Sequence, residues 1–202
     1  MANSCWNWVH ISGPKETLDI IEERFNKYDE MKDFTFTQFS RMVLGIEPDV
    51  APDYETAKLK KIKSFISISE MFSRIYNYGT KWWAFEIERG GDWMEIRGDS
   101  AWSPPLGLLT IITKVFDVKI NGEYSEPGCD FGGFYNIENG ECEDRQMTYF
   151  EYELECGRKE AIGRLINDMN EEFIDMECAE KHNKPHLTEE EWNQVLTETN
   201  NK

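Results

Sequence analysis

Hydrophobic and polar residues alternate along residues 6–12, the pattern of a strand with one buried face. Gly13 and Pro14 end this strand, and proline suits the first position of a helix. Apolar side chains then recur at helical spacing, at Leu18, Ile21, Phe25 and Tyr28. The chain is therefore predicted to begin with a strand followed by an amphipathic helix.

A β-hairpin is predicted further along the chain. Alternating runs at residues 82–89 and 93–98 are separated by a Gly-Gly-Asp turn at residues 90–92, which is typical of hairpins. Residues 30–77 come before this hairpin and read as an insertion. The second part of the insertion, from about residue 56, has helical spacing.

The remaining elements are predicted from the same strand alternation and helical spacing, together with proline and capping residues. Residues 103–105 (Ser-Pro-Pro) begin an apolar helix that runs to about Phe116. Thr188 and Glu191 form the capping box of a short helix that extends to Leu196. Further strands are predicted at residues 117–125, 131–137 and 148–155, and a long helix at residues 158–177.

This order predicts an α+β fold. Strand, helix, strand, strand, helix, strand is the ferredoxin-like or split βαβ arrangement, with its helices on one face of the sheet. We expect a ferredoxin-like domain over residues 1–145, with an insertion after the first helix at about residues 30–77. Residues 146–202 are expected to form an acidic extension made of a strand and helices.

The charge of the chain is strongly acidic and unevenly distributed. It has 39 acidic and 22 basic residues, a formal net charge of −17. Residues 138–202 hold 18 acidic and 7 basic side chains, against 21 and 15 in residues 1–137. Because such a chain repels phosphate at long range, direct sequence-independent binding to nucleic acid is disfavoured.

The sequence favours a cytoplasmic protein without a cofactor. Its first residues lack the basic and apolar regions of a signal peptide, and no run of about 18 apolar residues could span a membrane. Neither a phosphate loop nor a dinucleotide fingerprint is present. The cysteines are odd in number and scattered, and we expect reduced thiols at Cys5, Cys129, Cys142, Cys156 and Cys178.

One set of residues has the types and spacing of metal ligands. Cys178, His182 and His186 would share one face of a continuous helix, and zinc accepts sulfur and imidazole ligands. Pro185 breaks the helix before His186, and a fourth ligand would have to come from Cys142 or Cys156. We therefore expect no metal site, and a metal-dependent enzyme on these residues is the weakest of the functions considered.

The acidic C-terminal part is the main candidate for a binding surface. Carboxylates on a rigid helix could compete with phosphate for the Lys and Arg residues of a nucleic-acid-binding protein. The ordinary explanation for such a run of charge is a solvated helix face. The candidate residues are Glu171, Glu172, Asp175, Glu177, Glu180, Glu189, Glu190 and Glu191.

An alternative is a module that binds nucleic acid or nucleotides. Six tryptophans cluster on the predicted strands or at their ends, namely Trp6, Trp8, Trp82, Trp83, Trp93 and Trp102. Bases stack on such surfaces in modules of similar topology. About half of these rings must face the core, and an exposed aromatic sheet face would also suit a homodimer. The dense basic cluster that could assist is Lys58, Lys60, Lys61 and Lys63.

Several segments together show a family resemblance. Residues Met1–Gly13, Tyr78–Trp82 and Ala101–Pro105, followed by Tyr124–Gly128 and Phe131–Gly133, occur in order along the chain. Together they resemble the YubB-like or Api-like ferredoxin-like domain family of phage and plasmid proteins. The resemblance covers residues 1–140 and implies a ferredoxin-like fold and a phage or plasmid source. This family has no assigned activity, so no functional residue is carried over.

Charge and context together favour a non-enzymatic protein that binds a host protein in the host cytoplasm. The expected partner is a nucleic-acid-processing complex, such as a CRISPR-like or nuclease defence system, which the acidic surface would inhibit. This expectation rests on analogy of charge and context and names no catalytic residue.

Overall fold

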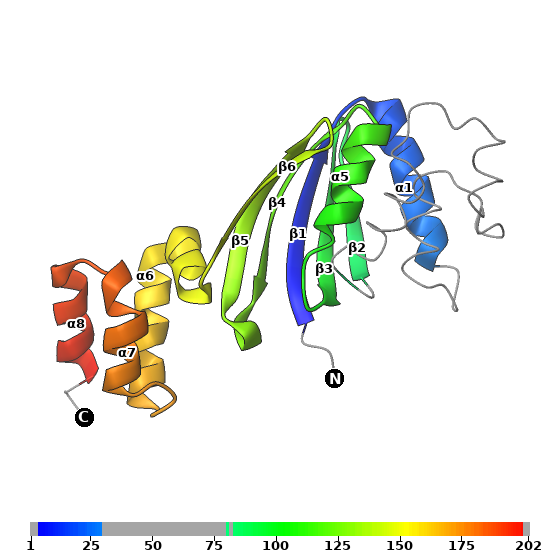
Figure 1. Cartoon of the computed structure of the whole chain (residues 1–202). Helices are drawn as coiled ribbons and strands as arrows, with labels where there is room; N and C mark the ends of the chain where they lie inside the picture. The colour runs from blue at the N-terminus through cyan, green and yellow to red at the C-terminus, as the bar shows by residue number, and fades with distance from the viewer. Residues whose placement is uncertain (1–3, 30–79, 81–82, 200–202) are drawn as a thin grey trace, which may run out of the picture. The chain divides into compact units, whose positions relative to one another are not determined.

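The computed structural model of the chain describes residues 4–29, 80 and 83–199 (Figure 1). The chain divides into two compact units. The sheet unit comprises residues 1–126 and 133–145, and the C-terminal unit comprises residues 127–132 and 146–202. The predicted helix in the insertion lies outside the described residues, as does Trp82.

The described part of the chain begins with strands and helices mixed along the sequence and ends with helices alone. In order they are β1 (Ser4–Ser12), α1 (Lys15–Asp29), β2 (Trp83–Arg89), β3 (Trp93–Ala101), α5 (Leu106–Val115), β4 (Lys119–Glu126), β5 (Phe131–Glu138), β6 (Glu141–Met147), α6 (Tyr149–Asn170), α7 (Met176–His182) and α8 (Glu189–Thr199). A short 3-10 helix, Pro127–Cys129, joins β4 to β5, and another, Lys184–His186, follows α7.

The sheet confirms the predicted topology. Its strands are hydrogen-bonded in the order β2-β3-β1-β4-β5-β6. β1 pairs antiparallel with β3 on one side and with β4 on the other, and β2 pairs antiparallel with β3. Strands β1 to β4, with α1 and α5 as crossovers, are therefore the ferredoxin-like split βαβ arrangement. β5 and β6 extend this sheet beyond β4.

The two described helices of the sheet unit cover one face of the sheet. In Figure 1, α1 and α5 lie on the same side of the strands. Cys5, Asn7, Val9 and Ile11 of β1 are fully buried, whereas the residues that alternate with them are exposed or half-buried. We call the opposite face, which carries those alternate residues, the open face of the sheet.

Aromatic side chains join α1 to β2. The ring of Phe25 lies 5.9 Å from the ring of Trp83 and 5.3 Å from that of Phe85, in edge-to-face geometry. Phe25 and Trp83 are buried, and a fully buried ring of this size stabilises the fold by about 1.5–3 kcal/mol. The helix predicted from Leu18, Ile21 and Phe25 is thereby fixed to the sheet.

The strand predicted at residues 148–155 is wrong, because this segment begins α6. Thr148 is the N-cap, its side chain accepts a hydrogen bond from the backbone N–H of Glu151, and the Glu151 side chain bonds back to Thr148. This capping box favours a helix over the strand that the alternation of residues 148–155 suggested. The backbone of Gly157 is not helical, which explains why the helical period resumed only near residue 158.

Two further predictions differ from the structure. The long helix was expected to reach residue 177 but ends at Asn170, and a separate helix, α7, begins at Met176. β6 was not predicted, because six of its seven residues are exposed and its sequence shows no apolar alternation. Pairing with a neighbouring strand, and not burial of side chains, places β6 in the sheet.

The C-terminal unit has a hydrophobic core of its own. Leu165 and Ile166 of α6 pack there with Ala179 of α7 and with Trp192 and Val195 of α8. Arg158 of α6 also makes a two-pronged hydrogen bond to Glu191 of α8. Apolar contacts therefore join the three helices, and a polar contact also joins α6 to α8.

A buried amide holds the start of β1 in register. Asn7 is fully buried, and its Nδ2 donates to the carbonyl oxygen of Cys5 at 2.7 Å and to Oγ of Ser100 at 2.8 Å. The Ser100 hydroxyl in turn donates to the carbonyl of Ser103 at 2.8 Å, in the turn before α5. A single side chain thus links β1, β3 and the approach to α5.

Asn7→Ala should lower the free energy of unfolding by about 1–3 kcal/mol, because it leaves buried hydrogen-bonding groups without a partner. Urea unfolding followed by circular dichroism measures the change. Asn136→Ala is the matched control, since Asn136 is exposed on β5, and its effect should stay within about 0.5 kcal/mol. Equal losses in the two variants would contradict a structural role for the Asn7 network.

Candidate partner-binding surface

Five of the eight predicted acidic residues fall in a short stretch between α6 and the end of α7, which we call the 171–180 segment. All five are exposed, and the stretch contains no basic residue. They are Glu171, Glu172, Asp175, Glu177 and Glu180. The expectation that a single rigid helix carries them is wrong, because α6 ends before Glu171 and α7 begins after Asp175.

The end of α6 is a Schellman motif. The backbone N–H of Phe173 bonds to the carbonyl of Asp168 at 2.9 Å, and that of Glu172 to the carbonyl of Met169 at 3.3 Å. Glu172 occupies the left-handed position, with φ of 62°. Glycine is the usual residue at this position, so neither the end of the helix nor the turn could be recognised from sequence.

Phe173 is displayed at the surface by this motif. In a Schellman motif the residue after the left-handed position commonly makes a hydrophobic contact with the last turn of the helix. In this helix the residues available for that contact are Asn167 and Asp168, which are polar. Phe173 is 76% exposed, whereas its neighbour Ile174 packs on the C-terminal core. The long helix predicted at residues 158–177 would have included Phe173, and the polar pair before it was the signal for exposure.

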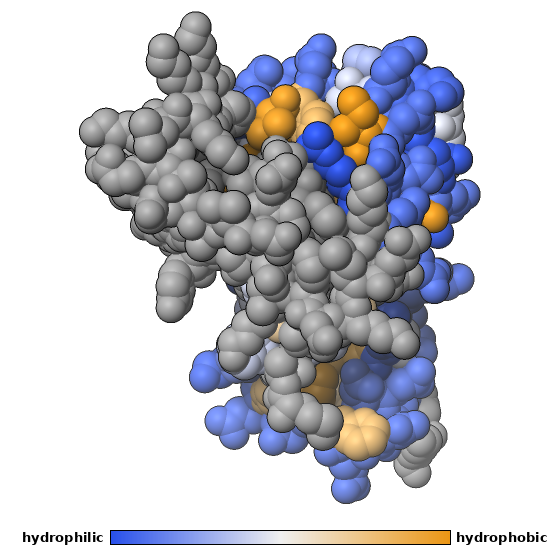
Figure 2. Space-filling view, turned by 90° about the vertical axis from the view of Figure 1, so that its right-hand side faces the viewer, coloured by the Kyte–Doolittle hydropathy of each residue, from blue (hydrophilic) through white to orange (hydrophobic). Residues whose placement is uncertain are grey.

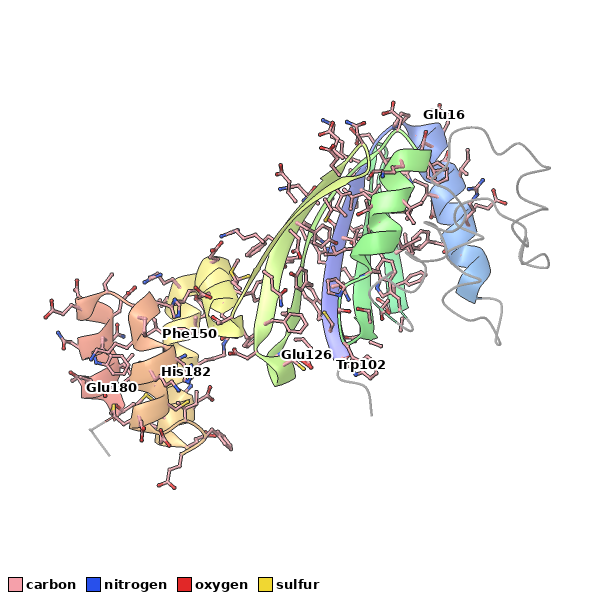
Figure 3. All side chains as sticks on the ribbon, viewed as in Figure 1. Glu16, Trp102, Glu126, Phe150, Glu180 and His182 are labelled. Carbon is pink, nitrogen blue, oxygen red and sulfur yellow. The ribbon has the colours of Figure 1, made fainter. Side chains whose placement is uncertain are left out.

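α7 presents the rest of the segment. Asp175 is its N-cap and accepts a hydrogen bond from the backbone N–H of Cys178 at 2.7 Å. Met176 is 38% exposed beside it. Glu180, labelled in Figure 3, lies 3.6 Å from Lys184 in an exposed ion pair. The segment therefore combines carboxylates with two exposed apolar side chains.

The remaining three predicted acids divide into two kinds. Glu189 and Glu190 are exposed in the first turn of α8, where negative charge stabilises a helix. Glu191 is instead part of the fold. One of its oxygens accepts hydrogen bonds from Arg158 Nη2 at 2.7 Å and from the Thr188 backbone N–H at 2.7 Å. Glu191 is thus not free to bind a partner.

The predicted metal ligands lie on two elements of the C-terminal unit. Cys178 and His182 are on α7, whereas His186 belongs to the 3-10 helix that follows it. Nδ1 of His186 lies 3.2 Å from a carboxylate oxygen of Glu151. Across residues 4–29, 80 and 83–199, no three cysteine, histidine or acidic side chains converge as metal ligands would.

The residues of the nucleic-acid alternative are only partly described. Lys58, Lys60, Lys61 and Lys63 lie outside the described residues. Trp83 belongs to the core, whereas Trp6, Trp8 and Trp93 lie on the open face of the sheet. Carboxylates surround them there, including Glu86, Glu88, Glu95 and Glu123. This face would repel a phosphate backbone.

The exposed surface offers few apolar residues. In the view of Figure 2 the described residues are mainly hydrophilic, with separate hydrophobic residues among them. Phe173 is the most exposed of the five large hydrophobic residues recorded at the described surface. Within that part of the chain, no helix combines the length and the apolar character that crossing a membrane requires. An exposed phenylalanine among carboxylates is accordingly the candidate for a protein-binding surface.

The fold defines the class of protein, a ferredoxin-like α+β protein. Residues 78–177 match the family model described as the ferredoxin-like domain in Api92-like protein. Residues 78–177 are therefore similar to the Api92-like family, which agrees with the Api-like part of the resemblance found in the sequence.

One solved structure is also similar to the chain. It is the crystal structure of a protein api92 from Yersinia pseudotuberculosis, which is 11% identical, with a TM-score of 0.42. The alignment covers 74% of this chain and 98% of that one. No curated protein matches the sequence.

Glu191→Gln should destabilise the C-terminal unit in a pH-dependent way. The hydrogen bond from Arg158, together with those from Thr188, lowers the pKa of Glu191 to about 2 from an ordinary 4.5. Because the pKa is depressed in the fold, the stabilisation is complete above about pH 4.5 and is lost as the pH falls towards 2.

The expected loss at neutral pH is about 1–2 kcal/mol, since the cap and the ion pair to Arg158 are weakened together. Thermal unfolding of both proteins across this pH range measures it, with the exposed Glu190→Gln as control. A difference between wild type and Glu191→Gln that stays constant down to pH 2 would contradict the assignment.

Proposed function

We propose that the chain is a non-enzymatic, phage- or plasmid-encoded protein that binds a host protein through its 171–180 segment. The partner surface is basic and normally contacts nucleic acid, as in a CRISPR-like or nuclease defence complex. By occupying that surface the protein inhibits the complex in the host cytoplasm. The observation that carries the proposal is the exposure of Phe173 in a segment that holds five carboxylates and no basic residue.

Charge supplies the attraction in this proposal. None of Glu171, Glu172 and Glu177 has an ion-pair partner among the residues that the structure describes. Lys and Arg side chains that bind phosphate would bind these carboxylates by the same charge-assisted hydrogen bonds. A chain with a net charge of −17 would also be steered towards a basic surface at long range.

Phe173 supplies the apolar contact area that carboxylates alone cannot contribute to affinity. Exposed ion pairs contribute little net affinity, typically below about 1 kcal/mol each. Burying a phenylalanine side chain in a partner pocket contributes about 1.5–3 kcal/mol, and such anchors dominate many interfaces. A surface with both features can be specific for one basic protein and need not bind every basic protein equally.

The test compares the tagged wild-type protein with three variants in affinity capture from a nuclease-treated lysate of the organism that carries its gene. Phe173→Ser removes the anchor. Glu171→Lys with Glu180→Lys reverses two charges near helix C-termini, where lysine is well tolerated. Glu160→Lys with Glu198→Lys is the control, because it makes the same change in net charge at exposed sites elsewhere in the same unit.

Wild type and control should retain the same nucleic-acid-binding protein, and the two 171–180 variants should lose it by about tenfold or more. Added duplex DNA should then displace the captured partner, because both ligands occupy one surface. Equal capture by all versions would refute a role for the 171–180 segment. Capture that DNA does not displace would show protein binding without mimicry of nucleic acid.

A further inference from the structure

The open face of the sheet carries a row of aromatic rings on two paired strands. Trp8 and His10 alternate with core residues along β1, and Trp93 begins β3. The ring of His10 lies 6.1 Å from that of Trp8 and 6.2 Å from that of Trp93, with only 20° between the planes of the latter pair. Trp6, on the same side of β1, is 37% exposed.

Carboxylates border this row on both sides. In the strand register Glu95 of β3 lies opposite His10, and Glu123 of β4 lies opposite Trp8. The Glu95 carboxylate is 3.6 Å from Nδ1 of His10, and a hydrogen bond from the Trp8 side chain is the main cause that lowers the pKa of Glu95. Burial raises the pKa of Glu123, so a cation placed beside it would relieve the cost of its charge.

The open face already holds one guanidinium group, that of Arg97, between carboxylates. Arg97 lies opposite Trp8 in the register, and its Nη2 pairs with Glu95 and lies 3.7 Å from a carboxylate oxygen of Glu88. Lys119, at the start of β4, is likewise paired, with Glu138 at 2.8 Å. Both cations are thus paired with carboxylates. Because the described residues of the open face include more carboxylates than these two cations, the net charge of the face is negative.

We propose that this face binds an arginine-containing segment of a partner protein, with the guanidinium stacked on the Trp8–His10–Trp93 row and paired with the bordering carboxylates. Tryptophan faces attract cations, and arginine also stacks on aromatic rings, which lysine does less well. Charge complementarity selects this occupant, because an anionic partner such as nucleic acid or a lipid headgroup would be repelled. The inference does not depend on the proposed function, which concerns the C-terminal unit.

The probes are a blocked arginine tetrapeptide and a blocked lysine tetrapeptide of equal charge, added to the full chain at physiological salt. Calorimetry measures affinity, and tryptophan fluorescence reports contact with the rings. The arginine peptide should bind about fivefold more tightly than the lysine peptide. Trp93→Leu should lower its affinity about fivefold, and Trp93→Phe should retain part of it.

Arg97→Ala provides the sharpest comparison. Removing this guanidinium frees Glu88 and Glu95 for the peptide, so affinity should rise. Lys159→Ala is the matched control, because it removes one positive charge from an exposed position on α6, which is distant in sequence from Arg97 and the strands of the open face. Only Arg97→Ala should improve arginine binding beyond the small effect of net charge.

Equal affinity for the two peptides, with no effect of Trp93→Leu in a protein that circular dichroism shows to be folded, would overturn the proposal. The same rise for Arg97→Ala and Lys159→Ala would also overturn it, since general electrostatic attraction would then account for binding. None of these results bears on partner capture by the 171–180 segment, so failure of one proposal is distinguishable from failure of the other.

Discussion

The position of β1 between β3 and β4 is the constraint on which the sheet unit depends. A strand paired on both sides cannot change register without breaking two ladders, and a shift by one residue would exchange its two faces. Val9 and Ile11 would then move to solvent, and Trp8 and His10 into the core. The buried hydrogen bond from Asn7 to Ser100 forms only in the observed register. This polar contact within an apolar layer therefore helps to specify the pairing of β1 with β3.

The same alternation separates the reactive groups of β1. Cys5 points into the core, where burial raises the pKa of its thiol to about 12, and His10 lies on the open face. The strand period therefore prevents this histidine from activating this thiol. The helices that the structure describes in the sheet unit lie on the other face, so they do not hold the aromatic and acidic side chains of the open face.

Sequence alone could predict the parts of the fold that bury one face at a regular period. This holds for β1, for α1 and for the hairpin of β2 and β3, where period and turn residues agree. It failed where another interaction decided: a capping box at Thr148 overrode apparent alternation, and β6 pairs without burying side chains. The acids at residues 171–180 could be found from composition, but the exposure of Phe173 depends on a helix end formed without glycine.

The 171–180 segment lowers the stability of the C-terminal unit in several ways at once. Glu172 adopts a left-handed conformation that costs a side chain about 1 kcal/mol relative to glycine. Phe173 leaves an apolar surface in water, and neighbouring carboxylates repel one another. A segment that served folding alone would be better built with glycine at 172 and a polar residue at 173. These costs are understandable if a partner covers the segment, because binding would bury the ring and neutralise the charge.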